Sequence, residues 1–265
     1  MSDLGLACML ALEDYAPLDL FGLRRAVAQV APRSTIQIER RRTPPGESAL
    51  FVEFDGQPFV VHASQERMPE AEYKEAVAGN LFWPEAGDAM ARHSACVTVC
   101  GAIRQRGHGL VRAQAIALTR LAASVSLAYQ AVGVHWLGTR AMASPSRLSR
   151  AAEELGNHLW PVDLWLGYVH FGTDRPGEQL VIGVQTVGAK EYLGFEIEVP
   201  QIPVVDKIEP IRILFGAVGY LIAHGRVIED GKLVEVQGER LSRWRLHLGK
   251  EDAPGLAQLT VVEGQ

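Results

Sequence analysis

The chain has 265 residues, of which 48% are hydrophobic and 22% are charged, so it can bury a substantial core and lacks the composition of a disordered protein. A formal net charge of −5 argues against a nucleic-acid-binding protein, which needs a basic surface. Three cysteines are too few, and an odd number, for the disulfide framework of a small secreted protein.

The first fifteen residues, MSDLGLACMLALEDY, lack the positive start and cleavage site of a signal peptide. The apolar run 4–12 is far shorter than the roughly 20 residues that cross a bilayer. We therefore expect a cytoplasmic protein that does not enter the membrane.

Hydrophobic periodicity and turn residues predict the elements of the first half of the chain. Two signals are specific. The residues DGQP between two apolar runs predict a hairpin over 49–63, and an Ala-rich stretch predicts a long helix over 110–131. The other predicted elements are strands at 4–12, 34–40 and 94–102, and helices at 17–30, 69–80 and 84–93.

The second half continues with a strand at 132–138 and a helix that begins at Ser144, a typical N-cap, followed by Pro145 at its first position. A second helix over 205–225 has Pro210 in its first turns and Gly225 at its end. The remaining predicted strands are 161–173, 179–188, 194–200, 227–236 with a DG turn, 239–249 and 257–264.

This order predicts an α/β chain of the α+β type, with mixed, largely antiparallel sheets and packed helices. A coarse repetition of strand, helix and strands leaves open whether the chain consists of two similar halves. Because no Pro/Gly/Ser-rich linker separates them, we expect a single domain over 1–265.

Residues 93–100 contain the pattern H-x-x-C-x-x-x-C, formed by His93, Cys96 and Cys100. Zinc needs about four N/S ligands, and Cys8 is the only other cysteine. A C-x-x-C redox pair is also missing. Since SACVTVC alternates like a strand, we interpret Cys96 and Cys100 as small core residues and expect no metal site.

No other motif specifies a reaction or a cofactor. A G-x-S-x-G elbow is missing, and the eight histidines are scattered. An enzyme acting on a small molecule, with His93 or His135 in a cleft, remains an alternative. The basic loop 104–112 precedes a helix and could receive an anion there, but we favour a solvated loop.

Residues 66–75 concentrate four carboxylates: Glu66, Glu70, Glu72 and Glu75. Such a run is usually the solvated face of a helix, yet it could also bind a basic protein. Five tryptophans are mostly surrounded by apolar residues and are expected in the core. Trp83 and Trp160, each followed by proline, are the candidates for partial exposure, and Trp83 is a candidate interface anchor.

An ordered series of segments resembles a bacterial domain-of-unknown-function family, the one numbered four-two-six-one. The segments are NLFWPEAGDAMARHSACVTV, ALTRLAASV, AVGVHWLG, LWPVDLWLGY, VQTVGAKEYLGFEIEV, GYLIAHGRVIEDGKLV and GERLSRWRL. The similarity covers about 80–262. The matching positions are Trp83, Pro84, His93, Gly133, Val134, Trp136, Leu164, Trp165, Gly188, Gly194, Glu196 and Glu198.

The chain departs from this family at two places. His135 stands where the family often has tyrosine, and DGKLVE stands where the family has DGDTIG. Because the family has no assigned catalytic residues, neither departure removes a known activity.

Such families occur beside secreted bacterial toxins, including type VI secretion effectors. The resemblance therefore implies an immunity protein that binds a cognate toxin, and the lack of catalytic and cofactor motifs favours a non-enzymatic role. Because a signal peptide is missing, we expect the toxin to act in the cytoplasm, with a nuclease as the leading expectation. Glu66, Glu70, Glu72, Glu75 and Trp83 are the candidate partner-binding residues. An adaptor that loads a secretion apparatus is a further alternative, and the sequence leaves the oligomeric state open.

Overall fold

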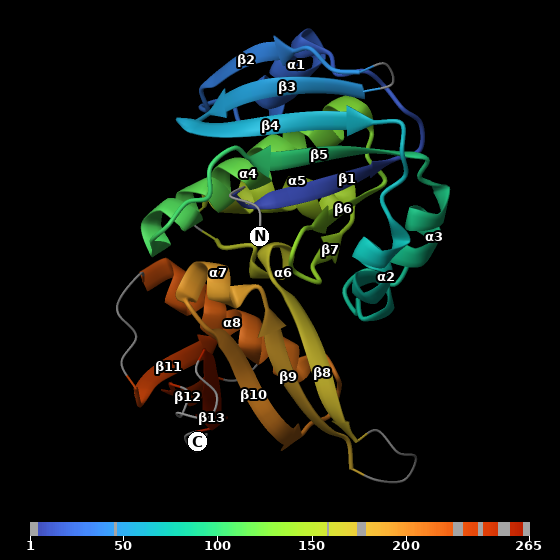
Figure 1. The fold of residues 1–265 in the computed structure, drawn as a ribbon. Coiled ribbons are helices and arrows are strands. Elements are labelled where there is room, and N and C mark those ends of the chain that lie inside the picture. Colours follow the sequence, from blue (N-terminus) through green and yellow to red (C-terminus); the bar gives the residue numbers. More distant parts are fainter. Residues whose placement is uncertain are drawn as a thin grey trace. The chain divides into compact units, whose positions relative to one another are not determined.

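The computed structural model describes residues 5–44, 47–157, 159–173, 179–224, 230–237, 241–248 and 255–261. Contacts within the chain group into two compact units, Met1–Leu164 and Trp165–Gln265, each containing one sheet (Figure 1). The boundary falls inside the four-residue helix α6 (Val162–Trp165), where the sequence carries no linker signal. The single domain expected from the sequence stays a prediction, since compactness does not say whether either unit folds without the other.

The N-terminal unit contains a seven-stranded sheet in the order β2-β3-β4-β5-β1-β6-β7, in which every neighbouring pair is antiparallel. Its strands are β1 (Ala7–Leu12), β2 (Ile36–Arg41), β3 (Glu47–Phe54), β4 (Gln57–Ser64), β5 (Ala95–Gly101), β6 (Gly133–Trp136) and β7 (Met142–Ala143). The first strand in the chain, β1, thus lies inside the sheet between β5 and β6.

The predicted hairpin is strands β3 and β4, joined by Asp55 and Gly56. Both residues have positive φ, 50° and 73°, as the favoured two-residue hairpin turn requires. The Asp55 carboxylate also accepts hydrogen bonds from the Ser34 hydroxyl and the Thr35 N–H, each at 2.9 Å. The turn therefore fixes both the register of the hairpin and the start of β2.

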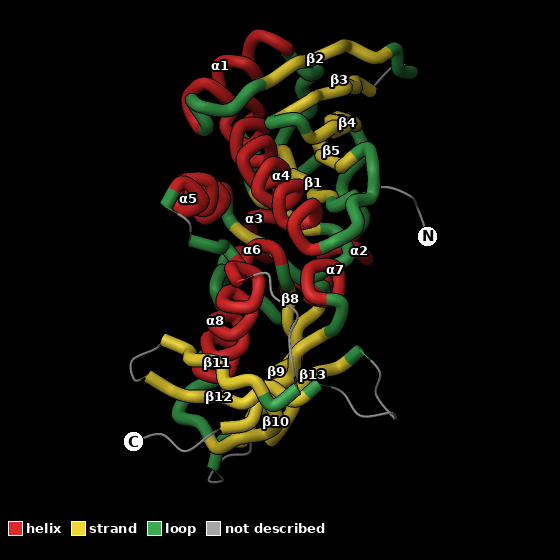
Figure 2. Tube along the Cα trace, turned by 90° about the vertical axis from the view of Figure 1, so that its left-hand side faces the viewer, coloured by secondary structure: helices red, strands yellow, loops and turns green. Residues whose placement is uncertain are grey.

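Alternating side chains give this sheet two different faces. Figure 2 shows α1 and α4 running along one side of the strands. Cys8, Leu10, Val97 and Val99 are buried on the face covered by α1 (Leu20–Val30), α4 (His108–Tyr129) and α5 (Pro145–Gly156). On the opposite face, Ala11 and Cys96 pack against α2 (Glu70–Ala78) and α3 (Ala86–Arg92).

The helices begin where their caps place them. The Asp19 carboxylate accepts from the N–H groups of Phe21 and Gly22, so α1 begins at Leu20, three residues after the expected Pro17. The Ser144 hydroxyl accepts from the Arg147 N–H, which confirms the predicted cap of α5. Helix α4 is long and apolar enough to cross a membrane, but 67% of its most apolar window is buried inside the protein, as in a core helix.

The C-terminal unit contains a six-stranded sheet in the order β11-β12-β13-β10-β9-β8, antiparallel except for the parallel pair β10–β13. Its strands are β8 (Gly167–Thr173), β9 (Val181–Val187), β10 (Glu196–Pro203), β11 (Lys232–Gln237), β12 (Leu241–His247) and β13 (Leu256–Val261). Helix α8 (Glu209–His224) packs on one face, where the rings of Tyr168 and Phe215 meet edge to face at 5.9 Å.

The α+β class with largely antiparallel sheets is confirmed, and each unit is a sheet with helices against it. The two sheets differ in strand number and in the parallel pair. The predicted strand 161–173 is wrong in its first part, because 162–165 form α6. The short helix α7 (Ala189–Leu193) was not predicted. The predicted helix end at Gly225 lies outside the described residues.

Candidate functional site

The four candidate carboxylates lie on α2 and on the segment that leads into it, and all four residues are exposed. Glu70 forms an exposed ion pair with Lys74 at 3.7 Å, and Glu75 pairs with Arg140. Within the described residues, Glu66 and Glu72 form no ion pair. The sequence-predicted acidic surface therefore exists, but two of its four charges are neutralised and two are available to a partner.

The turn between α2 and α3 is held by the side chain of Asn80. Its amide Nδ2 donates to the Met142 carbonyl at 2.7 Å, and its Oδ1 accepts from the N–H groups of Phe82 and Trp83, each at 3.0 Å. One side chain therefore ties this turn to β7 and fixes the backbone at the two aromatic residues.

The two neighbouring aromatic side chains have different roles. Trp83 is half-buried and packs against the core cluster beneath α2 and α3. A Cβ at Gly133 would lie 3.1 Å from both Trp83 and Met90, so glycine at 133 makes room for the indole. Phe82, in contrast, is 47% exposed. The more exposed aromatic residue of this surface is therefore Phe82 and not the predicted Trp83. No local sequence signal distinguishes Phe82 from a buried phenylalanine.

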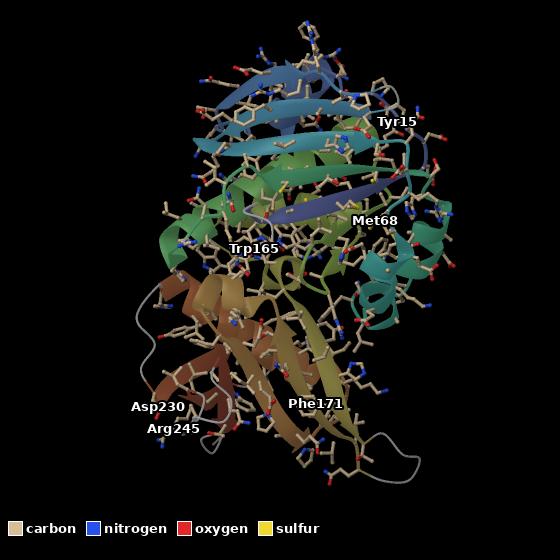
Figure 3. All side chains as sticks on the ribbon, viewed as in Figure 1. Tyr15, Met68, Trp165, Phe171, Asp230 and Arg245 are labelled. Carbon is tan, nitrogen blue, oxygen red and sulfur yellow. The ribbon has the colours of Figure 1, made fainter. Side chains whose placement is uncertain are left out.

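The core cluster beneath α2 and α3 is rich in sulfur. Its buried members are Ala11, Met68, Ala76, Ala86, Met90, Cys96 and Met142, with Met9, Tyr73, Val77, Trp83 and Val132 packed against it. Met68, labelled in Figure 3, precedes α2 and belongs to this cluster. Methionine fills irregular spaces between a sheet and short helices well, because its chain is unbranched and flexible.

His93 precedes β5 and is 1% exposed. Its Nδ1 lies 2.5 Å from the Met90 carbonyl oxygen, so Nδ1 carries the hydrogen, while the buried Nε2 has no hydrogen-bond partner in the described structure. Its ring meets that of Tyr73 edge to face at 5.6 Å. His93 is therefore a core histidine that anchors the end of α3 against α2.

His135 on β6 is 3% exposed, and its Nδ1 donates to the Ala141 carbonyl at 3.0 Å. Burial lowers the pKa of this imidazole, while the Ala141 carbonyl and the Glu72 carboxylate act in the opposite direction. Both histidines of the enzyme alternative thus belong to the packed layer between the sheet and α2–α3.

The lowered pKa of His135 predicts a loss of stability in acid. The unfolded chain takes up a proton near pH 6.5, whereas the folded chain does so only at lower pH, so the free energy of unfolding falls as pH drops through 6.5. This one group contributes a slope of at most about 1.4 kcal/mol per pH unit. Urea denaturation between pH 7 and 5 measures the slope, which we expect to be shallower in His135→Gln. Identical slopes would contradict the prediction.

The three cysteines are free thiols: Cys8 and Cys96 are buried and Cys100 is half-buried. Burial raises the pKa of all three, so they stay protonated and weakly nucleophilic near neutral pH. Cys96 and Cys100 lie on one face of β5, where the sequence pattern placed them.

Two other features of the sequence have structural roles. The basic loop before α4 lies beside Gln114, whose amide accepts from the Leu6 N–H and donates to the Ile103 carbonyl, joining the loop to the start of β1. Trp160 is half-buried, with the guanidinium of Arg112 over its ring at 5.4 Å. The interpretation of 104–112 as a solvated loop stays a prediction.

Three residues of the family resemblance form a capping arrangement in the C-terminal unit. Gly188 and Gly194 have φ of 100° and 88° on either side of α7. The Glu196 carboxylate accepts from the N–H groups of Gly188 and Ala189, each at 3.0 Å, and from the Thr186 hydroxyl at 2.6 Å. These residues shape a turn of the backbone and need no ligand to explain them.

A groove of about 370 Å³ lies between α1, α4 and α5 on the far side of the N-terminal sheet from α2. Its lining consists mostly of small and polar residues: Gln29, Val30, Ala123, Ser126, Leu127, Gln130, Ala131, Pro145, Ser149 and Glu153. Glu153 is its one ionisable side chain, and neither His93 nor His135 reaches it. The groove therefore does not assemble an acid–base pair.

Among the residues that the structure describes, no group of three or more His, Cys, Asp and Glu side chains could hold a metal ion. No family model matches the chain, and neither a curated protein nor a solved structure matches it. The family resemblance of the sequence therefore stays a prediction, and the chemistry of the α2–α3 surface is the basis for a functional proposal.

Proposed function

We propose that this chain is an immunity protein that binds and neutralises a cognate toxin, a type VI secretion effector acting in the cytoplasm. The observation that carries the proposal is the Phe82 ring, 47% exposed on a turn whose backbone is held by Asn80. An aromatic side chain on a rigid segment makes an effective interface anchor, because little conformational entropy is lost when it is buried.

The negative charges on and near α2 favour a partner with a basic surface. Glu66 and Glu72 are exposed and form no ion pair within the described residues. Glu72 lies on α2, Glu66 shortly before it, and the Phe82 turn follows this helix. A toxin that acts on nucleic acid carries a basic surface to bind phosphates. Acidic side chains on and just before the helix that leads to an aromatic anchor would attract such a surface and raise the association rate. A nuclease is therefore the proposed class of toxin.

The experiment uses the product of the toxin gene that neighbours the gene for this chain. We expect a complex between the two purified proteins, and growth of cells that express both. Phe82→Ala should weaken binding about 30-fold, since a central aromatic anchor contributes about 2 kcal/mol. Isothermal titration calorimetry measures the affinity, and growth of the co-expressing strain measures protection.

The matched control is Phe21→Ala, because Phe21 is 82% exposed on α1, which covers the opposite face of the sheet. This variant should bind as the unchanged protein does. If Phe82→Ala binds with unchanged affinity, the assigned surface is wrong. A complex that gives no protection would instead indicate an adaptor, and no complex at all would refute the proposal.

A further inference from the structure

Three side chains from separated parts of the sequence form a row across the N-terminal sheet. Met9 on β1 is directly opposite His135 on β6, and His135 is directly opposite Met142 on β7. Directly opposite residues on antiparallel strands point to the same face, with Cβ atoms about 4.5–5.5 Å apart. The result is a thioether, an imidazole and a thioether side by side.

The imidazole of this row is already oriented as a ligand would be. Its Nδ1 donates to the Ala141 carbonyl at 3.0 Å, which leaves the lone pair on Nε2. No hydrogen bond reaches that nitrogen from the described residues. Histidines that bind metals usually donate their other ring N–H to a carbonyl or carboxylate in this way. Burial also lowers the pKa of His135, which keeps the ring neutral near pH 7.

The burial and electrostatics around these three side chains suit the binding of a soft cation. Met142 is 6% exposed and His135 is 3% exposed, so both residues lie in the interior of the N-terminal unit. Met9 is half-buried and packs against the core cluster beneath α2 and α3. The Glu72 carboxylate acts on His135 electrostatically and favours positive charge nearby.

We propose that Met9, His135 and Met142 form a binding site for a soft monovalent metal ion, Cu(I) or its analogue Ag(I). Thioether sulfur selects such ions over Zn²⁺ or Mg²⁺, and a neutral imidazole completes the ligand set. No described cluster of His, Cys, Asp and Glu offers a competing site for a harder ion. The proposal does not rest on the immunity function, although the site adjoins the Phe82 surface through Glu72 and through the Met142 carbonyl, which accepts a hydrogen bond from Asn80.

The sharpest test follows the methionine methyl groups. The full chain is labelled with ¹³C at the methyl carbons of its five methionines and titrated with Ag(I) under NMR observation. We expect the Met9 and Met142 methyl signals to shift and to saturate at one ion per chain. Met68 and Met90 lie in the same core cluster but are not proposed ligands, so their signals should shift less than those of Met9 and Met142.

Affinity for Cu(I) is then measured by competition with a chromophoric Cu(I) chelator under anaerobic conditions. Met9→Leu and Met142→Leu should each weaken binding about tenfold or more, because leucine keeps the volume but removes the sulfur. Met68→Leu should leave affinity unchanged. The proposal fails if Met9 and Met142 do not shift. It also fails if binding survives in both leucine variants but is lost in Cys96→Ser or Cys100→Ser, which would identify a thiol site.

Discussion

Replacing Arg147 with alanine is expected to lower the free energy of unfolding by about 3 kcal/mol. The guanidinium binds Asp163 through two hydrogen bonds, Nε–Oδ2 and Nη2–Oδ1, each at 2.7 Å, and Glu154 through Nη1 at 2.9 Å. It thereby fastens α5 to the first residues of α6. The arginine side chain is 19% exposed and each carboxylate 27%, so the pair is only weakly screened by water.

The cost arises because alanine leaves Asp163 without its guanidinium and leaves Glu154 with only the exposed Arg150 as a counter-ion. Arg150→Ala is the matched control on the same helix, since Arg150 is 66% exposed and lies 3.7 Å from Glu154. An exposed pair of this kind contributes only about 0.5 kcal/mol. Urea denaturation followed by circular dichroism measures both variants. Equal stabilities for Arg147→Ala and Arg150→Ala would show that the buried network contributes nothing.

Removal of the Glu196 carboxylate is expected to destabilise the C-terminal unit by about 3 kcal/mol, because several donors lose a charged acceptor at once. The donors are the Thr186 hydroxyl and the N–H groups of Gly188, Ala189 and Lys190. The last three begin α7, a helix whose own N-cap, Gly188, has no side chain to satisfy them. Glu196→Ala should therefore unfold α7 first.

Glu198→Ala is the control, since Glu198 lies two residues along the same strand and accepts one hydrogen bond, from Gln258 at 3.0 Å. We expect that change to cost less than about 1 kcal/mol. Hydrogen–deuterium exchange of the peptide covering α7 separates the two cases. Fast exchange in both variants, or in neither, would contradict the assigned role of Glu196.

Local signals in the sequence predicted much of the fold. The Asp55–Gly56 turn, the Ser144 cap and the Ala-rich helix α4 each depend on a few neighbouring residues, and all three are confirmed. Helix α7 was missed because its N-terminus is capped by Glu196, which follows the helix. The position near 164/165 at which the contacts divide into two units was not predicted, because it falls within a helix without a linker.

The candidate site was less predictable, because its features depend on residues that are far apart in the sequence. The four carboxylates were found because they are close in sequence, and Trp83 because Trp-Pro is conspicuous. Their exposure, the ion pairs of Glu70 and Glu75, and the prominence of Phe82 depend on tertiary packing. The row of Met9, His135 and Met142 requires the strand order β1-β6-β7, which no local pattern reveals.

The interior position of β1 affects how the protein can be made. This strand hydrogen-bonds to β5 and to β6, so neither partner exists until the ribosome has added residues 95–101 and then 133–136. Until then β1 is an apolar segment of the nascent chain, and both of its edges are unpaired. Long-range pairing of this kind folds slowly and exposes strand edges to aggregation. Production of the protein should therefore benefit from chaperones that shield the nascent chain.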